Sequence, residues 1–438
     1  MAALVLSGCG DSQEGATEPH DSDATAEATP VERIILIVVD TLRVDYLGVH
    51  GSEIATPHID RLARKGMVFE NAIANFHSTT MSMAALFSGR TPSIESGNRE
   101  KTLEWNTFAS CGLSRFSTPE LDDACVPRRM EMLAEALRSA GYWTMGVTSN
   151  KLLYRPYGYD QGFDDWVEVG EEVPEGDLAA AVRAAKVRSA DFVNEQVTRV
   201  LARRARDRFF LYVHYIDVHD WLLHGKSYAE SVRDFDPLLG EMLDSLERDG
   251  LLEGALVVFT SDHGEMLVDQ HLHFRPKRHY GNPSLEPVLR VPLIVSPAGG
   301  EDRRAILRSQ DVKNLILGRA GLAADPAEDL EAEELIVTEQ LYQTYRKGHW
   351  KSIWERGKET PFLFDLSNDA NELRDIAGAH PEVVESHRRR VEELSAELAA
   401  PESHRRELDA EDRSRLRALG YLDDEDAAAA EAGGAPAP

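Results

Sequence analysis

The segment Ile34–Val39 constrains the fold most, because it is a continuous run of β-branched and leucine residues that ends at Asp40. Such a run is typical of a strand buried on both faces, as in a parallel sheet covered by helices. A similar run, Val257–Thr260, ends just before Asp262 and His263. Predicted helices over 59–65, 130–140, 187–204, 235–248 and 311–320 alternate with predicted strands over 34–39, 143–148, 209–215, 255–260 and 292–295. This alternation predicts an α/β fold with a doubly wound, mainly parallel central sheet.

Polar residues gather where the predicted strands end. In open α/β sheets, ligands bind beyond the carboxyl ends of the strands, and these ends carry Asp40, Asn150, His214–His219 and Asp262–His263. Asp40 alone is equally consistent with a cap on the following helix. Together with Asp262 and His263 it predicts a site for one divalent cation. Carboxylate oxygen combined with imidazole nitrogen suits Zn or Mn, whereas Ca prefers oxygen alone.

Composition divides the chain into four parts. Residues 1–31 are a leader and a low-complexity tether, and residues 401–438 are an acidic, alanine-rich tail. Between them, residues 32–333 are predicted to form one large domain and residues 334–400 a small α+β subdomain. The predicted elements of the subdomain are strands over 335–338, 350–354 and 362–366 and a helix over 382–398. The formal net charge of −28 disfavours nucleic acid as a partner.

The first residues resemble a bacterial export signal. Leu6–Cys9 matches the lipobox that marks lipoproteins for acylation on cysteine. Because the apolar stretch before Cys9 is shorter than about 7 residues, we expect the natural start to lie upstream. The match predicts an exported, periplasmic or membrane-anchored lipoprotein that meets the membrane only through a lipid on Cys9, and the alternative is a free cysteine in an unrelated leader. In an oxidising compartment, Cys111 and Cys125 are expected to pair, although two unpaired thiols are also compatible with their spacing.

Longer motifs, spread over nearly the whole folded chain, resemble the sulfatase family of the alkaline-phosphatase-like superfamily. They are IILIVVDTLRVDYLG, TPHIDRLARKGMVFENAIA, AALFSGRTPS, LAEALRSAGYWT, FLYVHYIDVHD, VVFTSDHGE, VLRVPLIVSPAG, FLFDLSNDANELRDIAG and LRALGYL. The resemblance implies a large α/β domain with a mixed central sheet and a small C-terminal antiparallel sheet. It also implies an anionic ester as substrate and a divalent metal at the nucleophile, which we leave open as Ca, Mn, Zn or Mg.

The nucleophile position of the family falls on Thr79. In the family, the nucleophile begins a pattern of Cys or Ser, any residue, Pro, Ser and Arg, and it lies six residues before an Ala-Leu pair. In this chain the pair is Ala85–Leu86. This chain keeps the serine but has Met81 and Met83 in place of the proline and arginine. Threonine cannot be oxidised to the formylglycine of most sulfatases. It can attack directly, because a cation lowers the cost of deprotonating a coordinated hydroxyl.

The resemblance also implies the remaining site residues. The implied metal ligands are Asp40, Thr79, Asp262 and His263. His219 matches the histidine that, in the family, touches the anionic group being cleaved. A further lysine or histidine is expected among Lys277, Arg278 and His279. We favour His279 as catalytic, because the sequence that follows it resembles the His-Gly-Asn of the family.

These observations predict a metal-dependent hydrolase of sulfate or phosphate-type esters with Thr79 as the nucleophile. Thr41 stands where sulfatases carry a second acid, and the ligand set resembles that of lipoteichoic acid synthases and phosphoethanolamine transferases. Both features favour a phosphodiesterase or phosphoryl transferase of the same superfamily as an alternative. Met81 and Met83 favour another alternative, a catalytically silent binding protein.

Overall fold

The structure is a computed structural model that describes residues 31–92, 94–95, 113, 126–170, 189–204, 208–267, 271, 273–274, 284–325, 330–338, 341–355 and 357–400. The predicted lipidation site Cys9, the predicted pair Cys111 and Cys125, and the residues 277–279 lie outside the described residues, as does the tail 401–438. No helix among the described residues is long and apolar enough to cross a bilayer.

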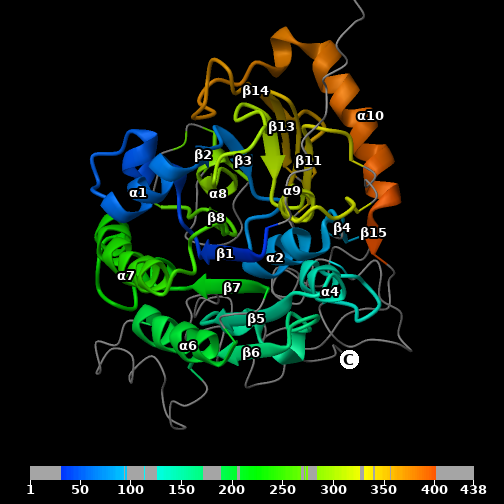
Figure 1. Cartoon of the computed structure of the whole chain (residues 1–438). Helices are drawn as coiled ribbons and strands as arrows, with labels where there is room; N and C mark the ends of the chain where they lie inside the picture. Colours follow the sequence, from blue (N-terminus) through cyan, green and yellow to red (C-terminus); the bar gives the residue numbers. More distant parts are fainter. Residues whose placement is uncertain are drawn as a thin grey trace, which may run out of the picture.

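A seven-stranded sheet forms the centre of the molecule, with the strand order β2-β9-β8-β1-β7-β5-β6 (Figure 1). The strands are β1 (Arg33–Val39), β2 (Met67–Val68), β5 (Trp143–Thr148), β6 (Asp165–Glu168), β7 (Phe209–Tyr215), β8 (Leu256–Thr260) and β9 (Leu293–Ser296). The central strand β1 pairs in parallel with both β7 and β8. Only the β8–β9 and β9–β2 pairs are antiparallel. The prediction of a mixed, mainly parallel sheet is therefore confirmed.

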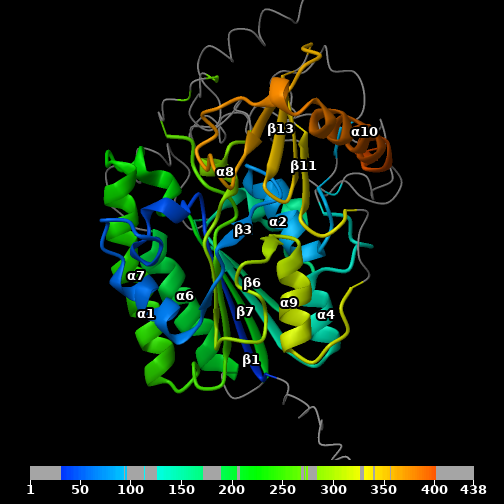
Figure 2. The same cartoon turned by 90° about the horizontal axis from the view of Figure 1, so that it is seen from above.

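Helices cover both faces of this sheet (Figure 2). One face carries α1 (Pro57–Lys65), α6 (Ser189–Arg204) and α7 (Tyr228–Arg248), and the other carries α2 (Thr79–Ser88), α4 (Leu133–Ser139) and α9 (Asp311–Arg319). Alternate residues of β1 enter the two cores: Ile35 and Ile37 join the first, and Ile34 and Leu36 join the second. Because each face of β1 needs apolar side chains, the strand is a continuous apolar run.

Several helix starts differ from the predictions: α1 begins at Pro57 rather than at 59, and α10 (Pro381–Glu397) begins at Pro381 rather than at 382. α7 begins at Tyr228 rather than at 235, because Ser227 and Glu230 form a capping box and Pro237 is accommodated inside the helix. α4 begins at Leu133 rather than at 130. The short strands β2, β3 (Asn71–Ile73), β4 (Ile94–Glu95), β6, β10 (Ile306–Arg308) and β15 (Ala399–Ala400) were not predicted. They are too short to show a hydrophobic period.

The C-terminal part is a four-stranded antiparallel sheet with one helix. Its strands are β11 (Glu334–Thr338), β12 (Tyr342–Lys347), β13 (Trp350–Glu355) and β14 (Phe362–Asp365), and its helix is α10 (Pro381–Glu397). Leu335, Val337 and Ile353 pack toward the central domain, in a cluster with Met81. The opposite face packs against α10. The small C-terminal antiparallel sheet with a helix is confirmed, and β12 is the strand that the sequence did not reveal.

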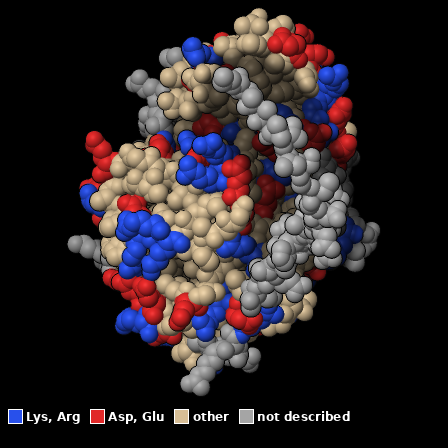
Figure 3. All heavy atoms as spheres, turned by 45° about the horizontal axis from the view of Figure 1, so that its top comes forward, with Lys and Arg blue, Asp and Glu red and all other residues tan. Residues whose placement is uncertain are grey.

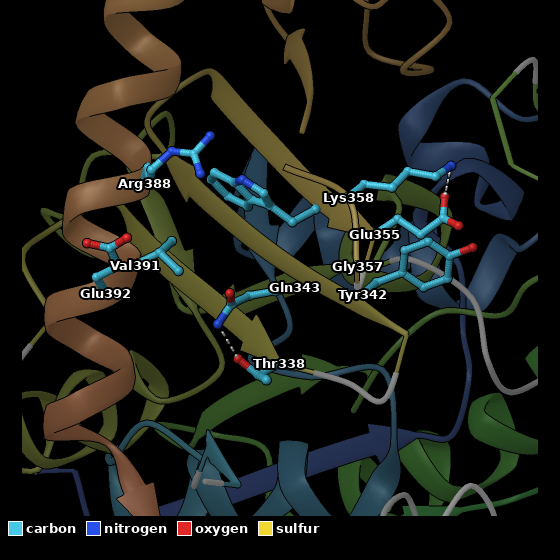
Figure 4. Close-up of a pocket in the computed structure, with 10 residues that line it drawn as sticks. Thr338, Tyr342, Gln343, Glu355, Gly357, Lys358, Arg388, Val391 and Glu392 are labelled. Carbon is cyan, nitrogen blue, oxygen red and sulfur yellow. Dashed lines mark hydrogen bonds and ion pairs between the residues drawn. The ribbon is translucent and has the colours of Figure 1, made fainter. Parts of the chain in front are cut away.

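A cavity of about 240 Å³ lies between α10 and the C-terminal sheet (Figure 4). Its lining includes Gln343, Trp354 and Arg388. Gln343 pairs with Trp354 across β12 and β13, one residue out of phase with Ile353, which faces the central domain. Because neighbouring residues of a strand point to opposite faces, this cavity opens on the outer face of the small sheet.

A buried ionic cluster joins the C-terminal sheet to the central domain. Lys351 on β13 is fully buried, and its Nζ lies 3.0 Å from Glu286 Oε1 and 2.7 Å from Glu372 Oε1. Burial alone would raise the pKa of Glu286, but the charges of Lys351 and Arg346 lower that pKa to about 2. Glu286 begins the short helix α8 (Glu286–Leu289), which also supports the segment after β8. The amide of Gly264 in that segment donates to Val288 O at 2.8 Å.

Surface charges of both signs are interspersed on the face shown in Figure 3. Among the described residues of that face, basic side chains lie next to acidic ones and do not gather into one broad area.

Candidate active site

The candidate site lies beyond the ends of β1 and β8. Asp40 follows β1 directly, and Asp262 and His263 follow β8, which lies beside β1 in parallel register. Each of the three residues offers one ligand atom, and these atoms all lie within 4.8 Å of one another. All three side chains are buried. The neighbouring strand ends thus bring together the residues that the sequence predicted as metal ligands.

Each carboxylate has one oxygen engaged with the protein and one that is not. Asp262 Oδ1 accepts from Thr41 N at 3.1 Å and from His263 N at 2.8 Å. Asp40 Oδ2 accepts from Asn150 Nδ2 at 2.5 Å. Among the described residues, Asp40 Oδ1 and Asp262 Oδ2 have no hydrogen-bond partner although both are buried. Buried carboxylate oxygens without a donor fit the ligand shell of a cation.

The tautomer of His263 also fits a metal ligand. His263 Nδ1 lies 2.7 Å from the carbonyl oxygen of Gly264, which can only accept, so Nδ1 carries the proton. The lone pair is then on Nε2, which lies 3.6 Å from Asp262 Oδ2. A histidine held by its other nitrogen in this way is the usual arrangement in protein metal sites.

The electrostatics of the two acids also favour a cation between them. Burial and the charge of Asp40 raise the pKa of Asp262. Burial would likewise raise the pKa of Asp40, but the hydrogen bond from His214 and the charge of His219 hold it well below its usual range. Two buried acids in mutual repulsion are stabilised when a cation binds between them.

Thr79 lies at the first turn of α2, directly beside these ligands. Its Oγ1 is 3.5 Å from Asp40 Oδ2 and 3.5 Å from His263 Nε2, and the side chain is buried. Thr79 is the first residue of the helix, after the N-cap residue Ser78. The N-terminus of a helix favours negative charge by about 0.3–1 kcal/mol. The position therefore suits an oxygen that becomes anionic.

The two methionines that depart from the family pattern pack into the interior. Met83 joins the core beneath α2, and Met81 joins the cluster that reaches the C-terminal sheet. Ser82, the residue that the chain keeps, donates from Oγ to Asp262 O at 2.5 Å. In this chain the two methionines thus supply packing, and Ser82 supplies one anchoring hydrogen bond. Met83, which stands at the arginine position, supplies no hydrogen-bond donor.

Asn150 supplies a donor beside Thr79. Its Nδ2 lies 2.5 Å from Asp40 Oδ2 and 3.5 Å from Thr79 Oγ1. Its Oδ1 accepts from Leu152 N at 2.9 Å, which fixes the orientation of the amide. The sequence marked Asn150 as a strand-end residue but gave it no role, because its approach to Thr79 depends on the position of β5 in the sheet.

His219 is buried at the start of the short helix η6 (His219–Trp221), and its Nδ1 lies 3.0 Å from Asp220 Oδ1. Burial alone would lower its pKa. The hydrogen bond with Asp220 and the charges of Asp40, Asp220 and Glu265 outweigh burial and raise the pKa of His219 to about 9. A cationic imidazole near Asp40 is suited to an anionic ligand.

The structure does not test the predicted role of His279. His279, with Lys277 and Arg278, lies outside the described residues. His271 and His273, to which the sequence gave no role, lie beside the C-terminal sheet: their rings are 6.3 and 6.0 Å from that of Phe364.

Comparison with known proteins decides the family. The model of the sulfatase family matches residues 32–321. The chain belongs to the sulfatase family. The predictions of the family and of a sulfatase-type hydrolase are thereby confirmed.

Relatives and solved structures agree with this placement. The chain is 24% identical to an N-acetylgalactosamine-6-O-sulfatase of Bacteroides thetaiotaomicron, over 80% of this chain and 90% of that one. It is 23% identical to an arylsulfatase of Clostridium perfringens, over 78% and 89%. An N-acetylgalactosamine-6-sulfatase of Rattus norvegicus is 26% identical over 56% of this chain, and the match spans 52% of that relative.

Two solved structures show the same fold. Ps i-CgsB in complex with k-i-k-neocarrahexaose superposes with a TM-score of 0.63 at 18% identity, covering 91% of this chain and 99% of that one. The phosphonate monoester hydrolase of Agrobacterium radiobacter superposes with a TM-score of 0.60 at 16% identity, covering 84% and 96%.

Proposed function

We propose that this sulfatase-family protein is a metal-dependent hydrolase of sulfate esters in which the Thr79 hydroxyl is the nucleophile. The observation that carries the proposal is the position of Thr79 Oγ1, 3.5 Å from both Asp40 Oδ2 and His263 Nε2 at the N-terminus of α2. The hydroxyl thus lies beside two of the residues that would hold the cation and at the positive end of a helix, and a cation and a helix N-terminus both favour an anionic oxygen.

Four atoms would hold the cation: Asp40 Oδ1, Asp262 Oδ2, His263 Nε2 and Thr79 Oγ1. A divalent cation, when bound, lowers the pKa of a coordinated hydroxyl and offsets negative charge on the ester. Because the donor set includes an imidazole nitrogen, we expect Mn²⁺ or Zn²⁺ to bind more tightly than Ca²⁺ or Mg²⁺.

The reaction has two steps at sulfur. The oxygen of Thr79 forms a bond to sulfur while the bond from sulfur to the ester oxygen breaks, and the proton of the threonine leaves on the released alcohol. Water then attacks the sulfur of the threonine sulfate ester. The bond to Thr79 breaks, which restores the hydroxyl and releases sulfate and one proton.

Two neighbouring side chains would act on the charges that develop. His219, whose pKa is raised to about 9, would be cationic at neutral pH and would offset charge on the sulfate oxygens. Asn150 Nδ2 would donate to the oxygen of Thr79, in place of the family arginine. We keep His279 as the candidate for a further contact to the substrate, as the sequence pattern predicts.

The names of relatives support a proposal for the substrate class. Two of them are named as sulfatases of N-acetylgalactosamine 6-sulfate, and another solved neighbour is in complex with D-glucosamine-2-N, 6-O-disulfate. We therefore propose a sulfated saccharide as the anionic ester.

A phosphate diester or a phosphonate ester is the second candidate substrate. The observation that favours it is the donor set of two carboxylates, one imidazole and a threonine hydroxyl, with Thr41 in place of the second acid. Attack by a hydroxyl needs no oxidised residue and serves phosphorus as well as sulfur.

The test is turnover of a panel of substrates by protein loaded with Mn²⁺, Zn²⁺ or Ca²⁺, with metal content measured in parallel. We expect aryl sulfate or a 6-sulfated amino sugar to be cleaved faster than aryl phosphate diester and aryl phosphonate. Faster cleavage of the phosphorus esters would replace the first candidate by the second. No turnover of any ester, with metal bound, would support a silent binding protein.

The expected location is likewise a proposal. We propose that the protein is exported and held at a bacterial membrane by a lipid on Cys9. Expression with an upstream signal segment and labelled fatty acid should label the wild-type chain but not Cys9→Ala. Equal labelling of both would contradict the proposal.

A further inference from the structure

Asp40 has a buried neighbour that the proposed reaction does not use. His214, at the end of β7, has no exposed surface, and its Nε2 lies 3.3 Å from Asp40 Oδ2. Its Nδ1 lies 2.7 Å from the hydroxyl of Tyr212, which is also fully buried. Because the two residues are two apart on one strand, their side chains project from the same face of the sheet, the face that α2 covers.

The partners determine where the protons lie. An ionised carboxylate can only accept, so the Nε2 that faces Asp40 carries a proton. In the neutral ring Nδ1 then has a lone pair, and the Tyr212 hydroxyl donates to it. Tyr212 thus donates to His214, and His214 donates to Oδ2 of Asp40, so that the three residues form one chain of hydrogen bonds.

Aromatic packing holds Tyr212, the first donor of these hydrogen bonds, in place. The ring of Tyr212 lies 4.9 Å from that of Phe87 on α2, nearly at right angles, and stacks at 6.0 Å on Trp166 of β6. A tyrosine packed on both sides keeps its hydroxyl in one place. The position of His214, and through it that of the Asp40 carboxylate, is therefore set from the core.

We propose that Tyr212 and His214 are positioning residues for a metal ligand. His214, together with Asn150, occupies Oδ2 of Asp40, and Tyr212 holds His214 in place. The carboxylate is thereby kept in the rotation that would present Oδ1 to the cation as a single-oxygen ligand. This inference rests on the proposed metal site. Residues that orient a ligand from behind typically change metal affinity by about 10- to 100-fold when they are removed.

The test is the affinity for Mn²⁺, measured by calorimetry on the full chain without substrate. Tyr212→Phe keeps the ring and removes only the hydroxyl, and we expect it to weaken Mn²⁺ binding about 10-fold. His214→Leu should weaken it further, up to about 100-fold. His214→Gln should recover part of the loss, because its amide can again donate to Asp40.

The matched control is Tyr215→Phe on the same strand. Tyr215 is also fully buried, and its hydroxyl donates to Asn194 Oδ1 at 2.7 Å on the other face of the sheet. The Tyr215→Phe substitution should leave the Mn²⁺ affinity unchanged. It should lower the thermal midpoint to a similar extent as Tyr212→Phe. Wild-type affinity in folded Tyr212→Phe would overturn the inference and leave the metal site intact. Absence of Mn²⁺ binding in the wild type would overturn both.

Discussion

Ser82 on α2 donates a hydrogen bond to the backbone carbonyl of Asp262 at 2.5 Å, and this bond joins the helix that carries Thr79 to the segment that carries two proposed metal ligands. Both groups are fully buried. The distance between the proposed nucleophile and the proposed metal ligands therefore depends on this contact.

Replacement of Ser82 by alanine should loosen that connection. Ser82→Ala leaves a buried carbonyl without its donor, which costs about 1–3 kcal/mol of unfolding free energy, and we expect metal affinity to fall with it. Ser88→Ala is the control, because Ser88 Oγ donates to Ala84 O at 2.6 Å and accepts from Arg90 N at 3.0 Å, and neither bond involves a proposed metal ligand. Denaturant unfolding and metal titration measure the two effects. Equal results for the two variants would contradict the role of Ser82.

The buried ion cluster predicts a large effect of one lysine. Lys351→Met leaves Glu286 and Glu372 without their common partner, and breaking a buried pair costs about 3–5 kcal/mol. Lys358→Met removes an exposed pair with Glu355 and should cost about 0–1 kcal/mol. Urea unfolding of both variants checks the difference. A loss below 1 kcal/mol in Lys351→Met would show that the cluster contributes little.

The Glu334–Arg390 pair predicts how stability changes in acid. Burial alone would raise the pKa of Glu334, but hydrogen bonds from Arg390 and Tyr345 lower it from 4.5 to about 2. Because the folded pKa lies below the unfolded one, the stabilisation is present above pH 4.5 and is lost as the pH falls toward 2. Glu334→Gln should therefore lose less stability than wild type over that window. Glu382→Gln, exposed on α10, should follow the wild-type curve.

The predicted pair of Cys111 and Cys125 has a direct chemical test. In protein exported to an oxidising compartment, titration of the denatured, unreduced chain should find neither thiol free, and reduction should release two. Two free thiols before reduction would contradict the pairing.

Much of the fold could be predicted from the sequence because β1 needs apolar residues on both faces, which leaves an unmistakable run before Asp40. The same reasoning found β5 and β7 with their observed bounds. It missed β2 and β3, whose two or three residues form strands only through pairing with distant segments.

Some residues of the candidate site could also be predicted from the sequence, and others could not. Asp40, Asp262 and His263 could be predicted as a group because Asp40 directly follows one recognisable strand and the other two lie within three residues of the end of another. The roles of Asn150 and His214 could not, because both reach Asp40 through the order of strands β1, β7 and β5, which the sequence does not specify. Their only signal was the strand-end position.

The measurement that tests the account most directly is the turnover number of Thr79→Ala at saturating cation, on an ester that the wild type cleaves. We expect a loss of at least about 10³-fold, because the nucleophile and one metal contact disappear together. Thr79→Ser should keep substantial activity, since its oxygen stays in place. Thr80→Ala, the neighbouring buried threonine, should remain close to wild type. Full activity of folded, metal-loaded Thr79→Ala would contradict the account and assign the attack to water.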